Sequence, residues 1–231
     1  MNANLEGFLS AIDRDGALRE TRELAESTTS RRNFLRFSAV GIGTVLFAGA
    51  QKARAARGLS ASDVSILNYA LVLEHLQAAF YTEAERSGAL TGKTAQAARV
   101  VGATERAHVE AFLKLLGSDA VKRPTFDFQG VTEHQHAFLK TAVAFEDLAV
   151  AAYKGQAPKL KSRAVLAAAV GIHSVEARHA AWMRELFGIT PAVRAFDQPS
   201  SRSEINRIVA STHFIVAKPQ MKGNKEPKFT G

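Results

Sequence analysis

The chain has 231 residues, of which 46% are hydrophobic and 23% charged, proportions that suit a globular protein and exclude a disordered one. It contains no cysteine, which excludes a disulfide scaffold, a cysteine–zinc site, an iron–sulfur cluster and a cysteine nucleophile. The formal net charge of +8 raises the question of nucleic-acid binding.

The N-terminal part of the chain, residues 1–55, is typical of an extension followed by an export signal. Residues 30–36 read Ser-Arg-Arg-Asn-Phe-Leu-Arg, an uncharged run follows over 37–50, and Ala53-Arg54-Ala55 is a candidate cleavage site. The paired arginines resemble a twin-arginine signal, which exports proteins already folded. We therefore expect the twin-arginine machinery as a partner, a periplasmic or otherwise exported location, and no membrane span after cleavage. The alternative is a basic segment that belongs to the fold.

Residues 56–190 carry a helical period of apolar positions, and glycines or caps divide them into four predicted helices. These helices are Ser60–Ser87, Thr94–Leu116, Thr132–Lys154 and Ser162–Phe187. Short connections pair the first helix with the second and the third with the fourth, whereas about 14 residues separate the two pairs. This predicts an all-α fold, an antiparallel four-helix bundle with one long crossover between helices two and three, which is the ferritin-like connectivity.

Each predicted helix carries glutamate or a glutamate–histidine pair at a defined place. The first and third helices carry Glu74 and Glu146, and the second and fourth carry E-x-x-H motifs, in which Glu and His share a face one turn apart. The motif residues are Glu105 with His108 and Glu176 with His179.

The spacing of these residues indicates an internal repeat. Glu74 and Glu146 are 72 residues apart, and Glu105 and Glu176 are 71 apart, as are the two motif histidines. A single E-x-x-H motif is a weak signal, but two at a repeated offset, each with a partner glutamate about 30 residues upstream, are a strong one.

Four glutamates in an apolar core need positive charge, because bare like charges would force protonation or unfolding. Two divalent ions would neutralise them, and carboxylate with imidazole suits iron or manganese. We therefore predict two divalent metal ions as cofactors, with iron as the expected metal and manganese as the alternative. These ions should stabilise the fold and bind more weakly at low pH. The alternative is a set of solvated residues on helix surfaces.

Two tyrosines follow the single glutamates by seven residues, Tyr81 and Tyr153, and are candidate catalytic residues; ordinary core tyrosines are the alternative. His173, one turn before Glu176, is a candidate ligand or a hydrogen-bonded neighbour of the site. The remaining histidines have no partner spacing and are interpreted as surface residues: His75, His134, His136 and His213.

Over about residues 60–188 the ligand pattern resembles the ferritin-like superfamily, with the full set found in bacterioferritins and rubrerythrins. With the export signal, the chain is similar to exported ferritin-like domain proteins. The resemblance implies that Glu74 and Glu146 are terminal ligands, that Glu105 and Glu176 bridge the metals, and that each motif histidine binds one metal. It also implies a redox role with ferrous iron, oxygen or peroxide.

Two features depart from the best-known relatives. No cysteine pair is present for a rubredoxin-type iron, and residues 191–231 predict an irregular basic tail with a short helix near Ser203–Ala210 and a strand-like 214–216. Two other functions stay open: manganese catalase-like peroxide disproportionation, and a non-catalytic, stress-protective bundle that metal stabilises. A homo-oligomer also stays open.

The distribution of charge along the chain answers the question of nucleic-acid binding. Residues 56–190 carry 15 basic against 13 acidic residues, so the predicted bundle is only +2. No basic stripe remains on it, and we expect no nucleic-acid partner.

Overall fold

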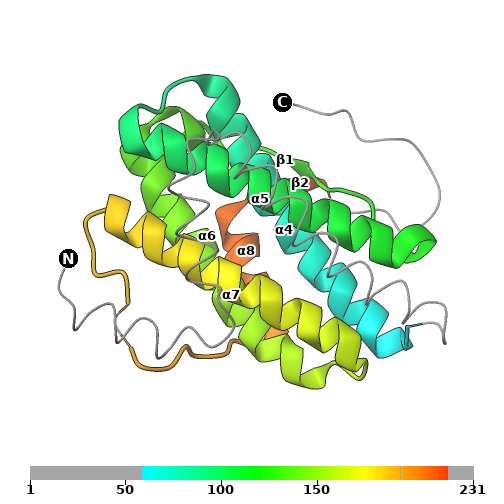
Figure 1. The fold of residues 1–231 in the computed structure, drawn as a ribbon. Helices are drawn as coiled ribbons and strands as arrows, with labels where there is room; N and C mark the ends of the chain where they lie inside the picture. The colour runs from blue at the N-terminus through cyan, green and yellow to red at the C-terminus, as the bar shows by residue number, and fades with distance from the viewer. Residues whose placement is uncertain (1–58, 193, 218–231) are drawn as a thin grey trace, which may run out of the picture. The chain divides into compact units, whose positions relative to one another are not determined.

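In a computed structural model, residues 59–192 and 194–217 are described, and the export-signal hypothesis, which rests on residues 30–55, lies outside them. Four long helices dominate the described part (Figure 1): α4 Ala61–Ser87, α5 Gly92–Leu116, α6 Gln135–Gln156 and α7 Arg163–Leu186. Local sequence sets their ends. The hydroxyl of Ser60 accepts a hydrogen bond from the Asp63 amide at the start of α4, and Gly88 ends that helix with φ +67°.

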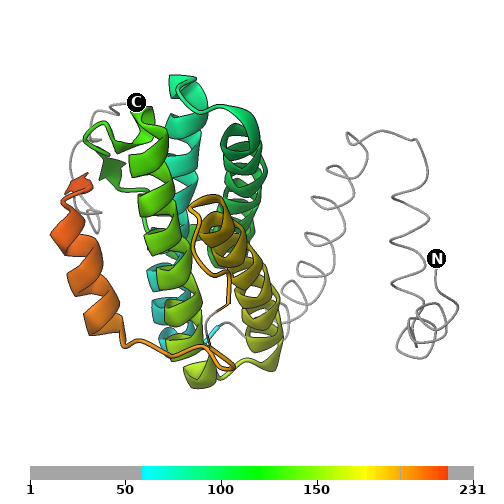
Figure 2. The same cartoon turned by 90° about the vertical axis from the view of Figure 1, so that its left-hand side faces the viewer.

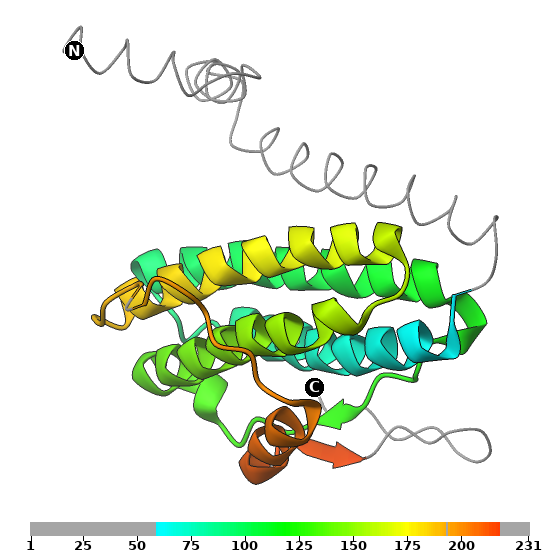
Figure 3. The same cartoon turned by 90° about the horizontal axis from the view of Figure 1, so that it is seen from below.

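The four helices pack in two pairs, α4 with α5 and α6 with α7, and the connection between the pairs runs from Gly117 to His134. Viewed along the layers, α5 and α7 lie in one layer and α4 and α6 in a second (Figure 3). The predicted fold class, a four-helix bundle with one long crossover, is confirmed. None of the helices in 59–192 and 194–217 is long and apolar enough to cross a membrane.

The crossover and the C-terminal segment form a third layer on the outer side of α4 and α6 (Figures 2 and 3). The crossover contains the 3₁₀ turns η1 Gly117–Asp119 and η2 Val131–Glu133 and the strand β1 Thr125–Phe126. After α7 the chain returns to helix α8 Arg202–Thr212 and strand β2 Ile215–Ala217, which pairs antiparallel with β1. A third 3₁₀ turn, η3 Ala157–Lys159, joins α6 to α7.

Close backbone contact fixes the returning segment. The Ser200 amide donates to the Ala151 carbonyl at 3.1 Å, and a Cβ at Gly155 would lie 2.0 Å from the Ser200 carbonyl oxygen. Only glycine leaves room for this crossing over α6. Helix α8 then buries Ile205 and Val209 in the same hydrophobic cluster as α4 and α6, so the tail completes the core on this side of the bundle.

Candidate metal centre

The six residues that the sequence singles out meet in the middle of the bundle. Glu74 comes from α4, Glu105 and His108 from α5, Glu146 from α6, and Glu176 and His179 from α7. The four glutamates are at most 1% exposed and the two histidines at most 7%. Their ligand atoms form two groups in which all atoms lie within 4.8 Å of one another.

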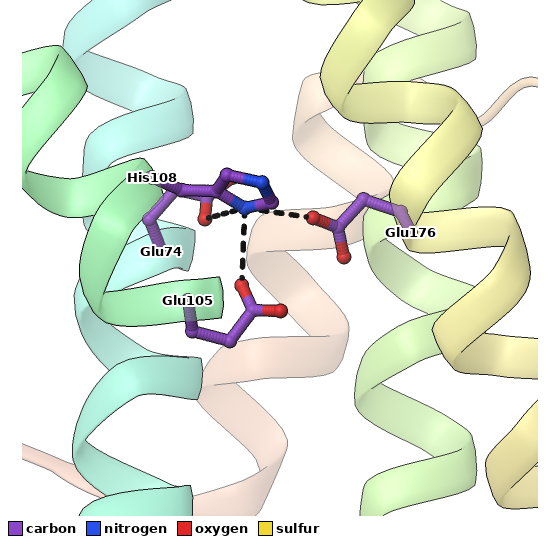
Figure 4. A group of neighbouring side chains, drawn as sticks. All are labelled: Glu74, Glu105, His108 and Glu176. Carbon is purple, nitrogen blue, oxygen red and sulfur yellow. Dashed lines mark hydrogen bonds and ion pairs between the residues drawn. The ribbon is translucent and has the colours of Figure 1, made fainter. Parts of the chain in front are cut away.

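The first group surrounds His108 (Figure 4). Nδ1 of His108 lies 3.2 Å from Oε2 of Glu74, 3.5 Å from Oε2 of Glu105 and 3.1 Å from Oε1 of Glu176. Three carboxylates from three helices, α4, α5 and α7, therefore converge on one imidazole nitrogen.

The second group surrounds His179 in the same way. Nδ1 of His179 lies 2.9 Å from Oε1 of Glu105, 3.6 Å from Oε2 of Glu146 and 4.0 Å from Oε2 of Glu176. The second group thus repeats the first, with Glu146 in the place of Glu74.

The two groups share Glu105 and Glu176, and each shared carboxylate divides its oxygens between them. Glu105 turns Oε2 to His108 and Oε1 to His179, and Glu176 turns Oε1 to His108 and Oε2 to His179. A carboxylate that presents one oxygen to each of two neighbouring positions has the geometry of a bridging ligand.

The two tyrosines hold the unshared glutamates, and each reaches across to the other hairpin. Tyr81 of α4 donates to Oε1 of Glu146 on α6 at 2.5 Å, and Tyr153 of α6 donates to Oε1 of Glu74 on α4. Each hydroxyl occupies one oxygen and leaves the other, Oε2, facing a histidine. The sequence predicted that the tyrosines lie near the site, but it did not predict which glutamate each tyrosine contacts.

Burial and charge oppose each other among these groups. Burial raises the pKa of Glu74 to about 7, and burial together with the Glu105 carboxylate raises the pKa of Glu176 well above its usual range. Burial also disfavours the ionised form of Glu105, but His108 and His179 outweigh it and lower the pKa to about 2. Without metal, protons must therefore supply the positive charge that the cluster needs.

Several polar atoms at the centre lie within ion-pair distance of a neighbour but form no hydrogen bond. They are both carboxylate oxygens of Glu105 and of Glu176, Oε2 of Glu146 and Nδ1 of His179. Buried polar atoms without hydrogen bonds are costly, and all of these belong to residues of the two groups. The donor set of four carboxylates and two imidazoles therefore fits two divalent cations, which would satisfy these atoms and neutralise the charge.

A comparison with known protein families matches residues 62–188, more than half of the chain, to the ferritin-like domain family. The chain belongs to this family. A comparison with curated proteins finds no match. The matched range contains all six clustered residues and both tyrosines, so the ferritin-like domain and the candidate metal centre coincide.

The other histidines of the ferritin-like domain lie outside the two groups. His173 is half-buried on α7, its Nε2 is buried without a hydrogen bond, and it does not join the clustered residues. His134, His136 and His213 are exposed, as expected.

The interpretation of His75 as a surface residue is wrong, because the side chain is 5% exposed. Burial, and after it the charge of Arg123, lower the pKa of His75 to about 4. Arg123 belongs to the crossover, which has no periodic pattern. Nothing in the local sequence of α4 could therefore have shown that Arg123 lies near His75.

Proposed function

We propose that this ferritin-like domain binds two divalent metal ions and oxidises ferrous iron with dioxygen or hydrogen peroxide. Iron is the expected metal, and manganese is the alternative. The division of the Glu105 and Glu176 oxygens between two histidine-centred groups supports this proposal best. Glu74 and Glu146 would be terminal ligands, Glu105 and Glu176 bridging ligands, and His108 and His179 ligands of one metal each.

Bound iron would supply the electrons and an open place for the oxidant. Two ferrous ions each lose one electron. The two electrons, with two protons, reduce one dioxygen to hydrogen peroxide, or one hydrogen peroxide to two molecules of water.

The chain itself supplies position, charge and proton control. The carboxylates would balance the positive charge of the ions in a buried core, and one hydroxyl fixes each of Glu74 and Glu146. Burial and the neighbouring carboxylates raise the pKa of Tyr81 and of Tyr153 well above the usual value, so both hydroxyls keep their protons as donors to the glutamates. Their second role in the proposal is to give one electron and one phenol proton each to the oxidant, so that two tyrosines would reduce one hydrogen peroxide to two molecules of water.

We also propose that the twin-arginine machinery exports the chain to the periplasm after it has folded and bound its metal. The support is the sequence of residues 30–55. Replacing Arg31 and Arg32 by lysine should leave the protein in the cytoplasm, as measured by fractionation, and unchanged export would contradict the proposal.

The proposed activity is tested with the natively produced chain. Bound metals are measured by elemental analysis, and ferrous oxidation and peroxide loss are followed in the wild type and in Glu105→Ala with His179→Ala. We expect two metal ions per chain and oxidation in the wild type, and neither in the variant. Absence of bound metal, or bound metal without turnover, would contradict the proposed activity.

A further inference from the structure

The two crossed tyrosines make the same contact with their glutamates but lie in different surroundings. Tyr81, which donates to Glu146, is 0% exposed, and Tyr153, which donates to Glu74, is 8% exposed. They belong to two separate hydrophobic clusters of the bundle. Because each hydroxyl holds one glutamate, the packing around a tyrosine also affects how freely that glutamate moves.

Aromatic rings enclose Tyr81. The ring of Phe80 meets it nearly edge-on, with 5.4 Å between centroids and 76° between planes, and the ring of Phe138 does so at 5.8 Å and 79°. Phe80 and Phe138 stack on each other at 5.1 Å, so the two rings form one packed wall, which we call the Tyr81 cage. The backbone of α5 also packs on Tyr81 at Gly102, where a Cβ would lie 2.8 Å from the tyrosine Cβ. Tyr81 therefore cannot move unless several buried groups move with it.

No such cage surrounds Tyr153. Within the described part of the chain no aromatic ring pairs with it, and the hydrophobic cluster around it is mostly aliphatic. The 72-residue offset of the internal repeat shows where the two halves differ, because Phe80 corresponds to Ala152 and Phe138 to Ile66. The repeat thus keeps the tyrosine in both halves and the cage in one.

An ion bound at the centre could not leave without local movement, because the four glutamates and two histidines are at most 7% exposed. Exchange at the second group, around His179, requires Glu146 to move together with Tyr81 and its cage. Exchange at the first group requires Glu74 to move together with Tyr153 alone. The first of these movements breaks two ring pairs that the other does not, so it has the larger barrier.

We propose that ions leave the centre in a fixed order, first from the group around His108 and then from the group around His179, because the Tyr81 cage holds the latter. The proposal rests on the proposed function and deepens it, because it says which of the two positions exchanges substrate iron more rapidly. The cage acts through the Tyr81 hydroxyl, so Phe80 and Phe138 are positioning residues.

Cobalt(II) makes the order of release measurable without redox chemistry. The full chain is loaded with two cobalt ions, an excess of a strong chelator is added, and the loss of the visible absorption of bound cobalt is followed with time. We expect two phases of similar amplitude with rates about tenfold apart, the factor that two edge-to-face ring pairs would supply. A single phase would overturn the proposal.

Two single-ligand variants assign the phases, because each should bind one cobalt ion. Glu146→Ala should keep the fast phase, and Glu74→Ala should keep the slow one. The opposite assignment, or the same rate in both variants, would overturn the proposal. Loss of both ions in either variant would contradict two separate positions and therefore the order as well.

A matched pair of variants tests the cage itself. Phe138→Leu removes one ring from the cage and should speed the slow phase several-fold while the fast phase stays unchanged. Phe126→Leu is the control for a general loss of packing, since Phe126 lies in the same hydrophobic cluster but its ring pairs with Phe128. This control should change neither phase. Equal acceleration by the two variants, or none by Phe138→Leu, would overturn the role of the cage.

The outcomes separate the two proposals. A chain that binds no cobalt contradicts both the proposed function and the order of release. Two ions that leave in one phase, or in the opposite order, overturn the order alone and leave the proposed function intact. Two ordered phases in a chain that oxidises no ferrous iron contradict the proposed activity and leave the order intact. If Phe138→Leu does not fold, as judged by circular dichroism, the wild-type phases and the two glutamate variants decide.

Discussion

The two helical hairpins, α4–α5 and α6–α7, present the same ligands to the centre but surround them with different residues. Each supplies one glutamate that belongs to a single group, one E-x-x-H pair and one tyrosine that reaches across to the other hairpin. Around these, Gly102 corresponds to His173. A Cβ at Gly102 would lie 2.8 Å from Cβ of Tyr81, so α5 packs directly on that tyrosine. The difference teaches that the two halves share the residues of the buried cluster, while the neighbours of those residues differ.

The largest expected effect separates the shared ligands from the unshared ones. Glu74→Ala and Glu146→Ala should each lose one metal ion, whereas Glu105→Ala should lose both, because Glu105, like Glu176, faces both histidines. At free metal of about 100 times Kd, loss of one ion removes about 2.7 kcal/mol of stabilisation. Elemental analysis and thermal unfolding measure these effects.

The control for these variants is Glu110→Ala, on the exposed side of α5, which should keep both ions. Equal metal loss in Glu74→Ala and Glu105→Ala would contradict the division into terminal and bridging roles.

Matched substitutions at the corresponding positions of the two hairpins test their different packing. Gly102→Val should lower the free energy of unfolding by about 1–3 kcal/mol, because its side chain meets Tyr81 and Glu85. His173→Val, at a half-buried position, should cost less than about 1 kcal/mol. Urea unfolding with metal present measures the free energy of unfolding of both variants. An equal loss in the two variants would contradict a difference in packing between the hairpins.

If the two groups bind metal equally well, the two crossed tyrosines should contribute equally to metal affinity. Tyr81→Phe and Tyr153→Phe should each lower metal affinity by about 10–100-fold, because each frees one terminal glutamate from its hydroxyl. Tyr69→Phe is the matched control, since the Tyr69 hydroxyl is buried without a partner and outside the centre. Metal titration measures the affinities, and an unchanged affinity in either site variant would show that its hydrogen bond does not support the ligand.

The smallest expected effect is the pH dependence of the metal-free protein. Glu74, with a folded pKa of about 7 against 4.5, keeps its proton on folding, so stability falls as the pH rises from 4.5 to 7. His179, whose pKa the nearby Glu105 and Glu146 raise to about 10 despite burial, contributes stability that is lost as the pH rises from 6.5 to 10. Glu105, with a lowered pKa of about 2, contributes stability that is lost below 4.5.

Metal-free protein should therefore be most stable near pH 4.5, and the gain in melting temperature on adding metal should grow as the pH rises above that value. Thermal unfolding across pH, with and without metal, measures both. A metal-induced gain that shrinks as the pH rises would contradict the assignment of these groups as ligands.

Much of the site could be predicted from local sequence. An E-x-x-H spacing places Glu105 beside His108 on any α-helix, and the repeated offset places Glu176 and His179 in the same way. Short connections predicted the helix pairs, and the structure confirms them. The helix and strand of the C-terminal segment also lie where the pattern suggested, at α8 and β2.

Other features depend on contacts between distant segments. The burial of His75 beside a charge as distant in sequence as Arg123 is a tertiary feature, and the crossing of the tail over α6 depends on Gly155. Neither contact follows from periodicity, because periodicity says which side of a helix is apolar and not which segment covers it.

The sequence by itself determined four helices, six candidate ligand residues and their repeat, because residues a few positions apart on a helix have fixed relative directions. Only the tertiary structure decided that Tyr81 meets Glu146 and Tyr153 meets Glu74, and that the Glu105 and Glu176 oxygens divide between two groups. Those pairings depend on how the helices slide and turn against one another. Side-chain packing across the whole core sets that register, which no single helix encodes.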